Sequence, residues 1–309
     1  MFTSLPQTSE AFERLSWAEI EPWYRELLES PLAVETLQPW MVQWSDLSAL
    51  INETMMRLDI GCTTNTADEE RPRRKQRFME EVFTPQQALD QQIKERLLAS
   101  RLEPEGFAVP LRNLRAEAAL YREENLPLLN EDNALSDEYY RIGGAQMVTW
   151  NGEEVPKTSI YSVQEDPDRT QRERAWRAIA EREDEDREKL DALWIKKMQL
   201  RQQIARNAGY ENYRDYRWRQ MLRFDYTPAD CQAFHAAVEQ VIVPAANRLW
   251  EKRRKLLGVE KLRPWDMQVN PRVSEAPRHI SDVDALLRQC ALVFQRIDPQ
   301  LGSYFETML

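Results

Sequence analysis

The chain has 309 residues, with 42 Lys and Arg against 52 Asp and Glu, so its formal net charge is −10. This acidic balance disfavours nonspecific nucleic-acid binding, which depends on cations that neutralise phosphates. Hydrophobic residues make up 42% and charged residues 30% of the chain, as in a folded globular protein rather than a disordered one.

The N-terminal sequence, the hydrophobic pattern and the cysteine spacing exclude several further classes of protein. No window approaches the roughly 18 consecutive apolar residues of a membrane span, and residues 1–6 lack the basic and apolar regions of a signal peptide. The three cysteines, Cys62, Cys231 and Cys290, lie far apart and lack the paired spacing of a disulfide framework or a structural zinc site. We therefore expect a cytoplasmic protein with free thiols and no membrane contact.

Helix signals recur along the first half of the chain. Ser16 and Glu19 have the spacing of a capping box, in which both side chains accept hydrogen bonds from free amides at a helix start. Beyond them, apolar residues recur at intervals of three and four and form a stripe that we expect to pack in the core: Leu37, Trp40, Met41, Trp44, Leu47, Leu50 and Ile51. Residues 85–101 and 108–126 predict two further amphipathic helices.

One segment interrupts this helical pattern. Asn151-Gly152 lies between two β-prone runs, and both residues tolerate the positive φ angles of a tight hairpin turn. The sequence therefore predicts a β-hairpin near 146–161.

A long charged helix should follow the hairpin. Between Pro167 and Gly209 no proline or glycine occurs, yet the central stretch 181–189 contains no apolar residue and must face water on most sides. Because such a helix exceeds the usual globular length, we expect a bend in this stretch.

The stretch 259–280 carries three prolines and no helical period, which indicates a loop. Within it, residues 265–270 are compatible with a short strand. The predicted fold is thus mainly α-helical: a multi-helix scaffold with a small hairpin near 146–161 and a short strand near 265–270.

Catalytic patterns are absent from the sequence itself. The only histidines, His235 and His279, lie 44 positions apart, so they cannot form the helical pair with which zinc peptidases hold their metal. A structural or capping role is the simpler interpretation of each. No nucleophile elbow, activated cysteine signature or glycine-rich phosphate loop occurs either.

Four motifs nevertheless have a familiar order and spacing. They read Ala208-Gly-Tyr-Glu-Asn-Tyr-Arg-Asp-Tyr216, Arg253-Arg-Lys-Leu-Leu-Gly258, Arg263-Pro-Trp-Asp266 and Leu301-Gly-Ser-Tyr-Phe-Glu-Thr-Met308. Together they resemble the M3 family of zinc oligopeptidases, the oligoendopeptidase F and thimet oligopeptidase group, over residues 148–309.

The resemblance implies a hydrolase that cleaves short peptides with zinc. In that family a His-Glu-x-x-His helix binds the metal and comes after this stretch, so we expect no catalytic residue, no metal ligand and no bound zinc in this chain. The Pro-Trp-Asp motif opens a strand beside the substrate channel in the family, which makes Trp265 and Asp266 candidates for channel residues.

The domain hypothesis places an N-terminal helical domain at 1–145 and the beginning of an M3-like catalytic domain at 146–309. Because the chain ends on Phe305, Met308 and Leu309 without a helix stop signal, we expect a fragment that exposes these residues and self-associates through this apolar surface. The leading hypothesis is the inactive N-terminal part of a zinc metallo-oligopeptidase. The alternative is a non-catalytic helical module that binds peptides or a protein on a peptidase scaffold.

Overall fold

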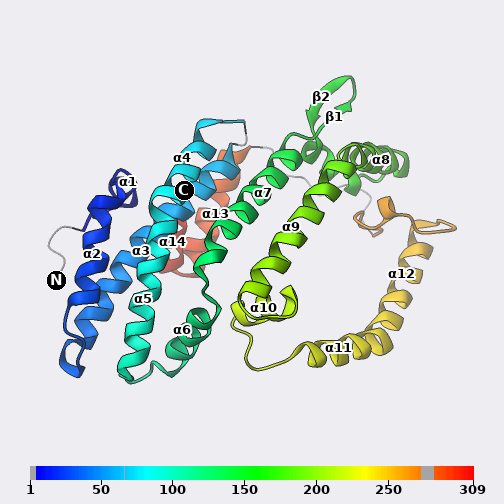
Figure 1. Ribbon diagram of the computed structural model, residues 1–309. Coiled ribbons are helices and arrows are strands. Elements are labelled where there is room, and N and C mark those ends of the chain that lie inside the picture. Colours follow the sequence, from blue (N-terminus) through cyan, green and yellow to red (C-terminus); the bar gives the residue numbers. More distant parts are fainter. Residues whose placement is uncertain (1–4, 66, 273–281) are drawn as a thin grey trace. The chain divides into compact units, whose positions relative to one another are not determined.

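The computed structural model describes residues 5–65, 67–272 and 282–309. It confirms the mainly α-helical fold and the small hairpin. The chain forms two compact units, one of Met1–Pro156 with Ala180–Val243 and one of Lys157–Ile179 with Pro244–Leu309. Figure 1 labels the helices and strands along the chain. Within the described residues, no helix is both long and apolar enough to cross a membrane.

The first unit begins with helices packed around one apolar core. Their bounds are α1 Ser9–Glu13, α2 Trp17–Glu29, α3 Val34–Thr64, α4 Glu70–Phe78, a π-helical turn η1 Met79–Phe83, α5 Thr84–Ser100 and α6 Ala108–Leu120. The predicted capping box is present, since the Ser16 amide donates to Glu19 Oε2 over 2.8 Å. The predicted stripe supplies much of the core, and the Trp40 indole donates to the Leu27 carbonyl over 2.9 Å.

A smaller core joins four further elements of this unit. The elements are a 3-10 turn η2 Glu123–Asn125, α7 Leu126–Gly144, α9 Arg187–Asn207 and α10 Tyr213–Gln220. Asn125 ties them together: its amide donates to the Ile204 carbonyl over 3.0 Å and its oxygen accepts from Asn207 Nδ2 over 2.7 Å. Because Asn125 is buried, these bonds replace the water that its amide has lost.

The hairpin is shorter than predicted. Strands β1 Met147–Trp150 and β2 Glu153–Pro156 pair antiparallel, and the turn has φ 54° at Asn151 and 90° at Gly152. Residues 157–161 are not strand, because the chain enters the 3-10 segment η3 Lys157–Glu165 directly after Pro156. Proline has no amide hydrogen to continue the ladder, which accounts for the early end of the strand.

The long charged helix bends where the sequence predicts. Helix α8 spans Arg169–Glu185, and α9 begins at Arg187 after a single non-helical residue, Asp186. The Asp186 carboxylate is buried and accepts hydrogen bonds from Lys189, Gln146 and Arg182. These bonds hold the pKa of Asp186 well below its usual range, so the bend is fixed by an ionised side chain.

The last elements are α11 Pro228–Ala237, a π-helical turn η4 Val238–Ile242, α12 Val243–Leu257, a 3-10 turn η5 Pro264–Asp266, α13 Val283–Ile297 and α14 Pro299–Met308. The short strand predicted at 265–270 is wrong. Pro264 starts a 3-10 turn, and Asp266 Oδ2 closes the turn by accepting from the Arg263 amide over 2.9 Å. A carboxylate that caps its own turn favours a turn over an extended strand.

Candidate functional site

The Asp266 carboxylate is the centre of a buried ionic cluster in the second unit. It accepts two hydrogen bonds from Arg169, each 2.9 Å, and one of 3.2 Å from Arg172 Nη2. Burial alone would raise the pKa of Asp266, but the bonds from Arg169, the Arg263 amide and Arg172 outweigh it and lower the pKa. Asp266 is therefore an ionised residue whose oxygens are already occupied by the protein.

Arg172 explains how the cluster forms. Its guanidinium is only 2% exposed and also donates to the carbonyls of Trp265, Asp166 and Pro167 over 2.8 to 2.9 Å. One arginine on α8 thus joins the helix start to the η5 turn. A buried guanidinium needs such a complete set of acceptors, because an unpaired buried charge is strongly destabilising.

Trp265 is buried beside this cluster. Its ring lies 5.5 Å from that of Trp176, and the guanidinium of Arg177 lies 5.2 Å from its centroid. The indole Nε1 is buried and has no hydrogen-bond partner among the residues that the structure describes. Trp265 therefore packs as a core side chain with one unsatisfied donor, which is a position that an incoming acceptor could satisfy.

Arg253 fixes the chain after the turn. From α12, its guanidinium donates to the carbonyls of Asp266, Met267 and Val269. Three carbonyls bound by one side chain hold residues 266–269 in a single irregular path. The two residues that the sequence proposed for a substrate channel are thus brought together, but as the anchor of a loop rather than as open ligands.

No metal centre can be assembled from the part of the chain that the structure describes: no group of three His, Cys, Asp or Glu side chains there could hold an ion. His235 is exposed on α11 beside Phe234, whereas His279 lies outside the described residues.

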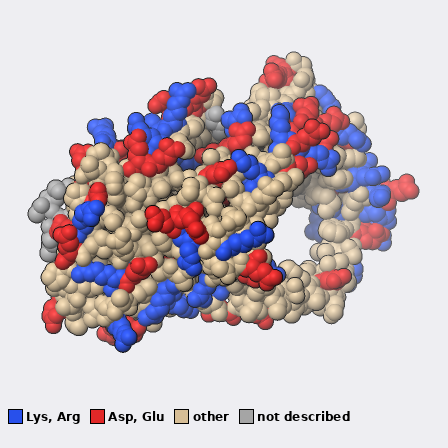
Figure 2. Space-filling view, viewed as in Figure 1, with Lys and Arg blue, Asp and Glu red and all other residues tan. Residues whose placement is uncertain are grey.

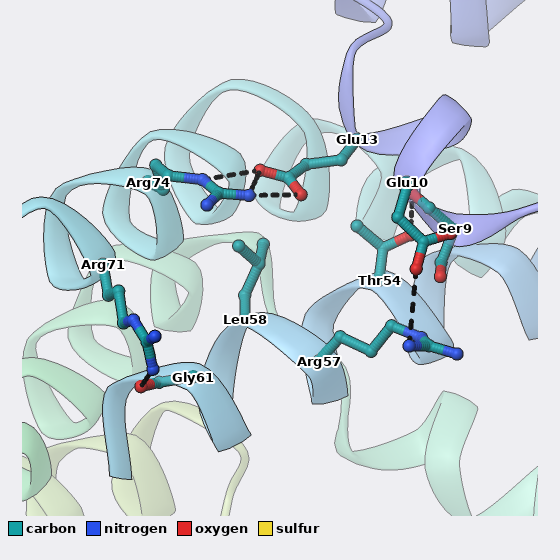
Figure 3. A pocket seen from close by; sticks show the side chains of 9 residues that line it. All are labelled: Ser9, Glu10, Glu13, Thr54, Arg57, Leu58, Gly61, Arg71 and Arg74. Atoms are coloured by element: carbon teal, nitrogen blue, oxygen red, sulfur yellow. Dashed lines mark hydrogen bonds and ion pairs between the residues drawn. The ribbon is translucent and has the colours of Figure 1, made fainter. Parts of the chain in front are cut away.

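The first unit also contains a pocket lined by charged side chains. It has a cavity volume of about 290 Å³ and is lined by both acids and arginines from α1, α3 and α4 (Figure 3). Arg74 makes a bidentate ion pair with Glu13, and Arg71 donates to the Gly61 carbonyl over 2.8 Å. Its charges are thus used to hold α1 against its neighbours. Figure 2 shows the same mixture of signs over the face that it draws.

The helices late in the chain expose large apolar side chains. Every residue of α12 is described and none is buried, and Leu249 is 66% exposed, with Trp250 and Leu256 exposed as well. Met308 and Leu309 are exposed, as expected, but Phe305 is not: its ring stacks 4.9 Å from that of Phe294 in the α13–α14 pair. An apolar helix surface of this kind usually marks a place where more protein binds.

Residues 162–285 match the family model described as peptidase family M3. This match confirms the resemblance that the motifs indicated, and it contains the whole Asp266 cluster. Comparison with curated proteins gives no match.

Solved structures extend the likeness over nearly the whole chain. A 3.1 Å X-ray structure described as an oligoendopeptidase F has 23% identity and a TM-score of 0.87, with 98% of this chain and 55% of that chain covered. A second, from Bacillus anthracis strain Ames, has 19% identity, a TM-score of 0.85, and 96% and 55% coverage. PZ peptidase A, solved with an inhibitor, has 23% identity, a TM-score of 0.84, and 99% and 54% coverage.

At these identities the likeness concerns the fold. The chain spans about half the length of the solved structures, with 54% to 55% of each covered. The activity of those longer proteins therefore reaches this chain only as a proposal.

Sequence reasoning identified Trp265 and Asp266 but missed the arginines that surround them. Arg169 and Arg172 lie 97 and 94 positions before Asp266 in the sequence. The arginine-rich start of the helix gives no local signal, because the four arginines at 169–177 are matched by four acids at 165–173. Arg253 was part of the Arg253–Gly258 motif, but that motif gave no indication that Arg253 binds carbonyls within residues 266–269.

Proposed function

We propose that this chain is the N-terminal part of a zinc metallo-oligopeptidase that supplies part of the substrate-channel wall and no metal ligand. The observation that carries the proposal is the family M3 match at 162–285 inside a scaffold that follows oligoendopeptidase F over 98% of the chain. The described residues do not fit a zinc ion, so the hydrolytic chemistry would need ligands from outside the part of the chain that the structure describes. Short peptides would be the substrates of the complete protein.

Within this proposal Trp265 and Asp266 act as positioning residues. The Asp266 cluster fixes the path of residues 264–269, and the buried Trp265 indole N–H, which has no acceptor among the described residues, would be available to an incoming acceptor. The proposed division into a helical domain at 1–145 and an incomplete catalytic domain at 146–309 belongs to the same hypothesis, as does a cytoplasmic location.

The test compares this chain with a version extended past Leu309 by the missing half of an oligoendopeptidase F. Each is assayed for zinc content and for hydrolysis of a short fluorogenic peptide. We expect zinc-dependent turnover from the extended protein only, because the histidine pair must come from the extension. Stoichiometric, chelator-sensitive zinc together with turnover by the 309-residue chain would overturn the proposal.

The alternative is a non-catalytic module that binds peptides or a protein partner. The exposed apolar side chains of α12 favour it, since such a surface suits a partner as well as a missing domain. The two hypotheses separate in the same experiment. An extended protein that stays inactive with zinc bound, beside a monomeric and stable 309-residue chain, would favour the module.

A further inference from the structure

The first unit contains a second cavity, of about 460 Å³, which is larger than the pocket between α1, α3 and α4. Its lining comes from the η1 turn and from α2, α3, α5 and α7, four helices that Figure 1 labels. The π-helical turn η1 contributes Met79 and Phe83 to the lining. Single π turns occur frequently at functional sites, because the extra residue displaces side chains from the regular helix face.

Polar groups form the inner wall of this cavity. The Tyr24 hydroxyl donates to Gln86 Oε1 over 3.0 Å, and both residues are buried. The Trp44 indole donates to Asp90 Oδ1 over 2.7 Å. Buried polar groups destabilise a protein unless they are bonded, and these bonds keep the inner wall rigid and preorganised.

The rim, in contrast, carries polar side chains that are free. Ser48, Asn52, Gln87 and Asn133 line the cavity, and none of them has a side-chain hydrogen bond to any residue that the structure describes. Each side-chain amide offers both a donor and an acceptor, so it can pair reciprocally with a peptide group. A hydroxyl and three amides around one cavity therefore match a ligand that itself carries amides.

The charged side chains at this cavity determine which end of an amide-bearing ligand is favoured. Lys94 lies 3.0 Å from Asp90 Oδ2 and 3.2 Å from Glu117 Oε2, so two carboxylates surround one ammonium. Burial lowers the pKa of Lys94, but Asp90 and Glu117 outweigh it and raise the pKa, which keeps the amine protonated. Asp90 and Lys94 line the cavity and Glu117 does not, but the three charges together sum to −1, which repels a carboxylate and attracts an amino terminus.

We propose that this cavity is a binding site for the amino-terminal residues of a short peptide, held through its amides by Gln87, Asn133 and their neighbours. The inference goes beyond the proposed function, since it concerns binding by the N-terminal helices alone and needs no metal.

The test uses two dipeptides on the purified 309-residue chain. Alanyl-glutamine amide has a free amine and no carboxylate, whereas N-acetyl-alanyl-glutamine has a carboxylate and no amine. Binding is measured by titration calorimetry and by ligand-observed NMR at millimolar concentration. We expect the amide to bind and the acetylated dipeptide to bind at least roughly tenfold more weakly, because it places a carboxylate near Asp90 and Glu117.

Gln87→Leu and Asn133→Leu should each weaken binding of the amide roughly fivefold to tenfold, the loss expected for one hydrogen bond. Gln92→Leu is the matched control, since Gln92 is an exposed glutamine on the same helix and does not line the cavity. Neither Gln87 nor Asn133 makes a side-chain bond that folding would lose, and melting temperatures verify that each variant is folded.

Three results would overturn the inference: no binding of the amide at millimolar concentration, binding that Gln87→Leu and Asn133→Leu leave unchanged, or equal binding of the acetylated dipeptide. None of them affects the proposed function, which depends on turnover by the extended protein. Conversely, an inactive extended protein would leave this binding site intact.

Discussion

Replacing Asp266 by Asn tests whether the ionic cluster holds the second unit together. The substitution keeps the shape of the side chain and removes its charge. Arg172, whose guanidinium is 2% exposed, would then be a buried cation without a carboxylate, whereas Arg169 is 41% exposed and can be rehydrated. Removing one partner of a buried pair destabilises by about 3–5 kcal/mol. We expect the low end of that range, because the new amide oxygen still accepts one hydrogen bond.

A matched variant isolates the effect of burial. Asp186 is also a buried carboxylate with cationic partners, but Lys189, one of these, is 69% exposed. Asp186→Asn should therefore destabilise clearly less than Asp266→Asn, since water can solvate the released lysine. Urea unfolding followed by tryptophan fluorescence measures both, and Trp176 and Trp265 report directly on the Asp266 cluster. Equal losses for the two variants, or a loss below about 1 kcal/mol for Asp266→Asn, would refute the reasoning.

The pH dependence provides an independent check. The pKa of Asp266 is lowered in the folded protein, so below the unfolded value of about 3.9 the unfolded state binds the proton more readily. The stabilisation is fully present above that value and is lost as pH falls through the folded pKa. The stability difference between the wild type and Asp266→Asn should therefore be constant from pH 5 to 7 and shrink below about pH 4. A difference that grows on acidification would contradict the assignment of Asp266 as the ionised partner.

Three further predictions concern other parts of the chain. Gly152→Ala should destabilise the hairpin by about 1 kcal/mol, because φ at Gly152 is 90°, and proteolysis near the turn should become faster. Asn125→Ala should lower the free energy of unfolding by about 1–3 kcal/mol, since the Ile204 carbonyl and Asn207 lose a buried partner; urea unfolding measures this, and no change would show that water replaces the amide. Trp250→Ser should reduce binding of a hydrophobic dye and self-association, as judged by light scattering, while a chain that is already monomeric and dye-silent would argue against an apolar docking surface.

Local patterns predicted the fold where its causes are local. The capping box at Ser16, the turn at Asn151-Gly152 and the bend near Asp186 each depend on residues within a few positions of one another. The short strand at 265–270 failed for the opposite reason. Pro264 and a self-capping Asp266 gave a turn, and that turn is held by arginines from α8 and α12 that no local window contains.

The sequence proposed Trp265 and Asp266 as channel residues, which stays a prediction, and it did not predict their surroundings. Trp265 and Asp266 came from a motif resemblance, which carries no information about whether a side chain is open or buried. The structure places both in a packed, ion-paired cluster. The cavity near Gln87 had no sequence signal at all, because its lining comes from four helices and the η1 turn, which lie far apart in the sequence.

The structural comparison and the family model match different lengths of the chain, and the kinds of residue that hold each part together offer a physical reason. The fold likeness covers 98% of the chain, whereas the family model matches only residues 162–285. The N-terminal helices are specified mainly by apolar residues at helical spacing, and volume-conserving swaps among these usually cost less than about 1.5 kcal/mol. The matched segment instead contains Arg172 and Asp266, a buried pair that loses about 3–5 kcal/mol if one partner changes. A segment with such a pair has fewer permitted substitutions than the apolar helices around Trp40 and Leu47, so a family pattern is easier to detect there.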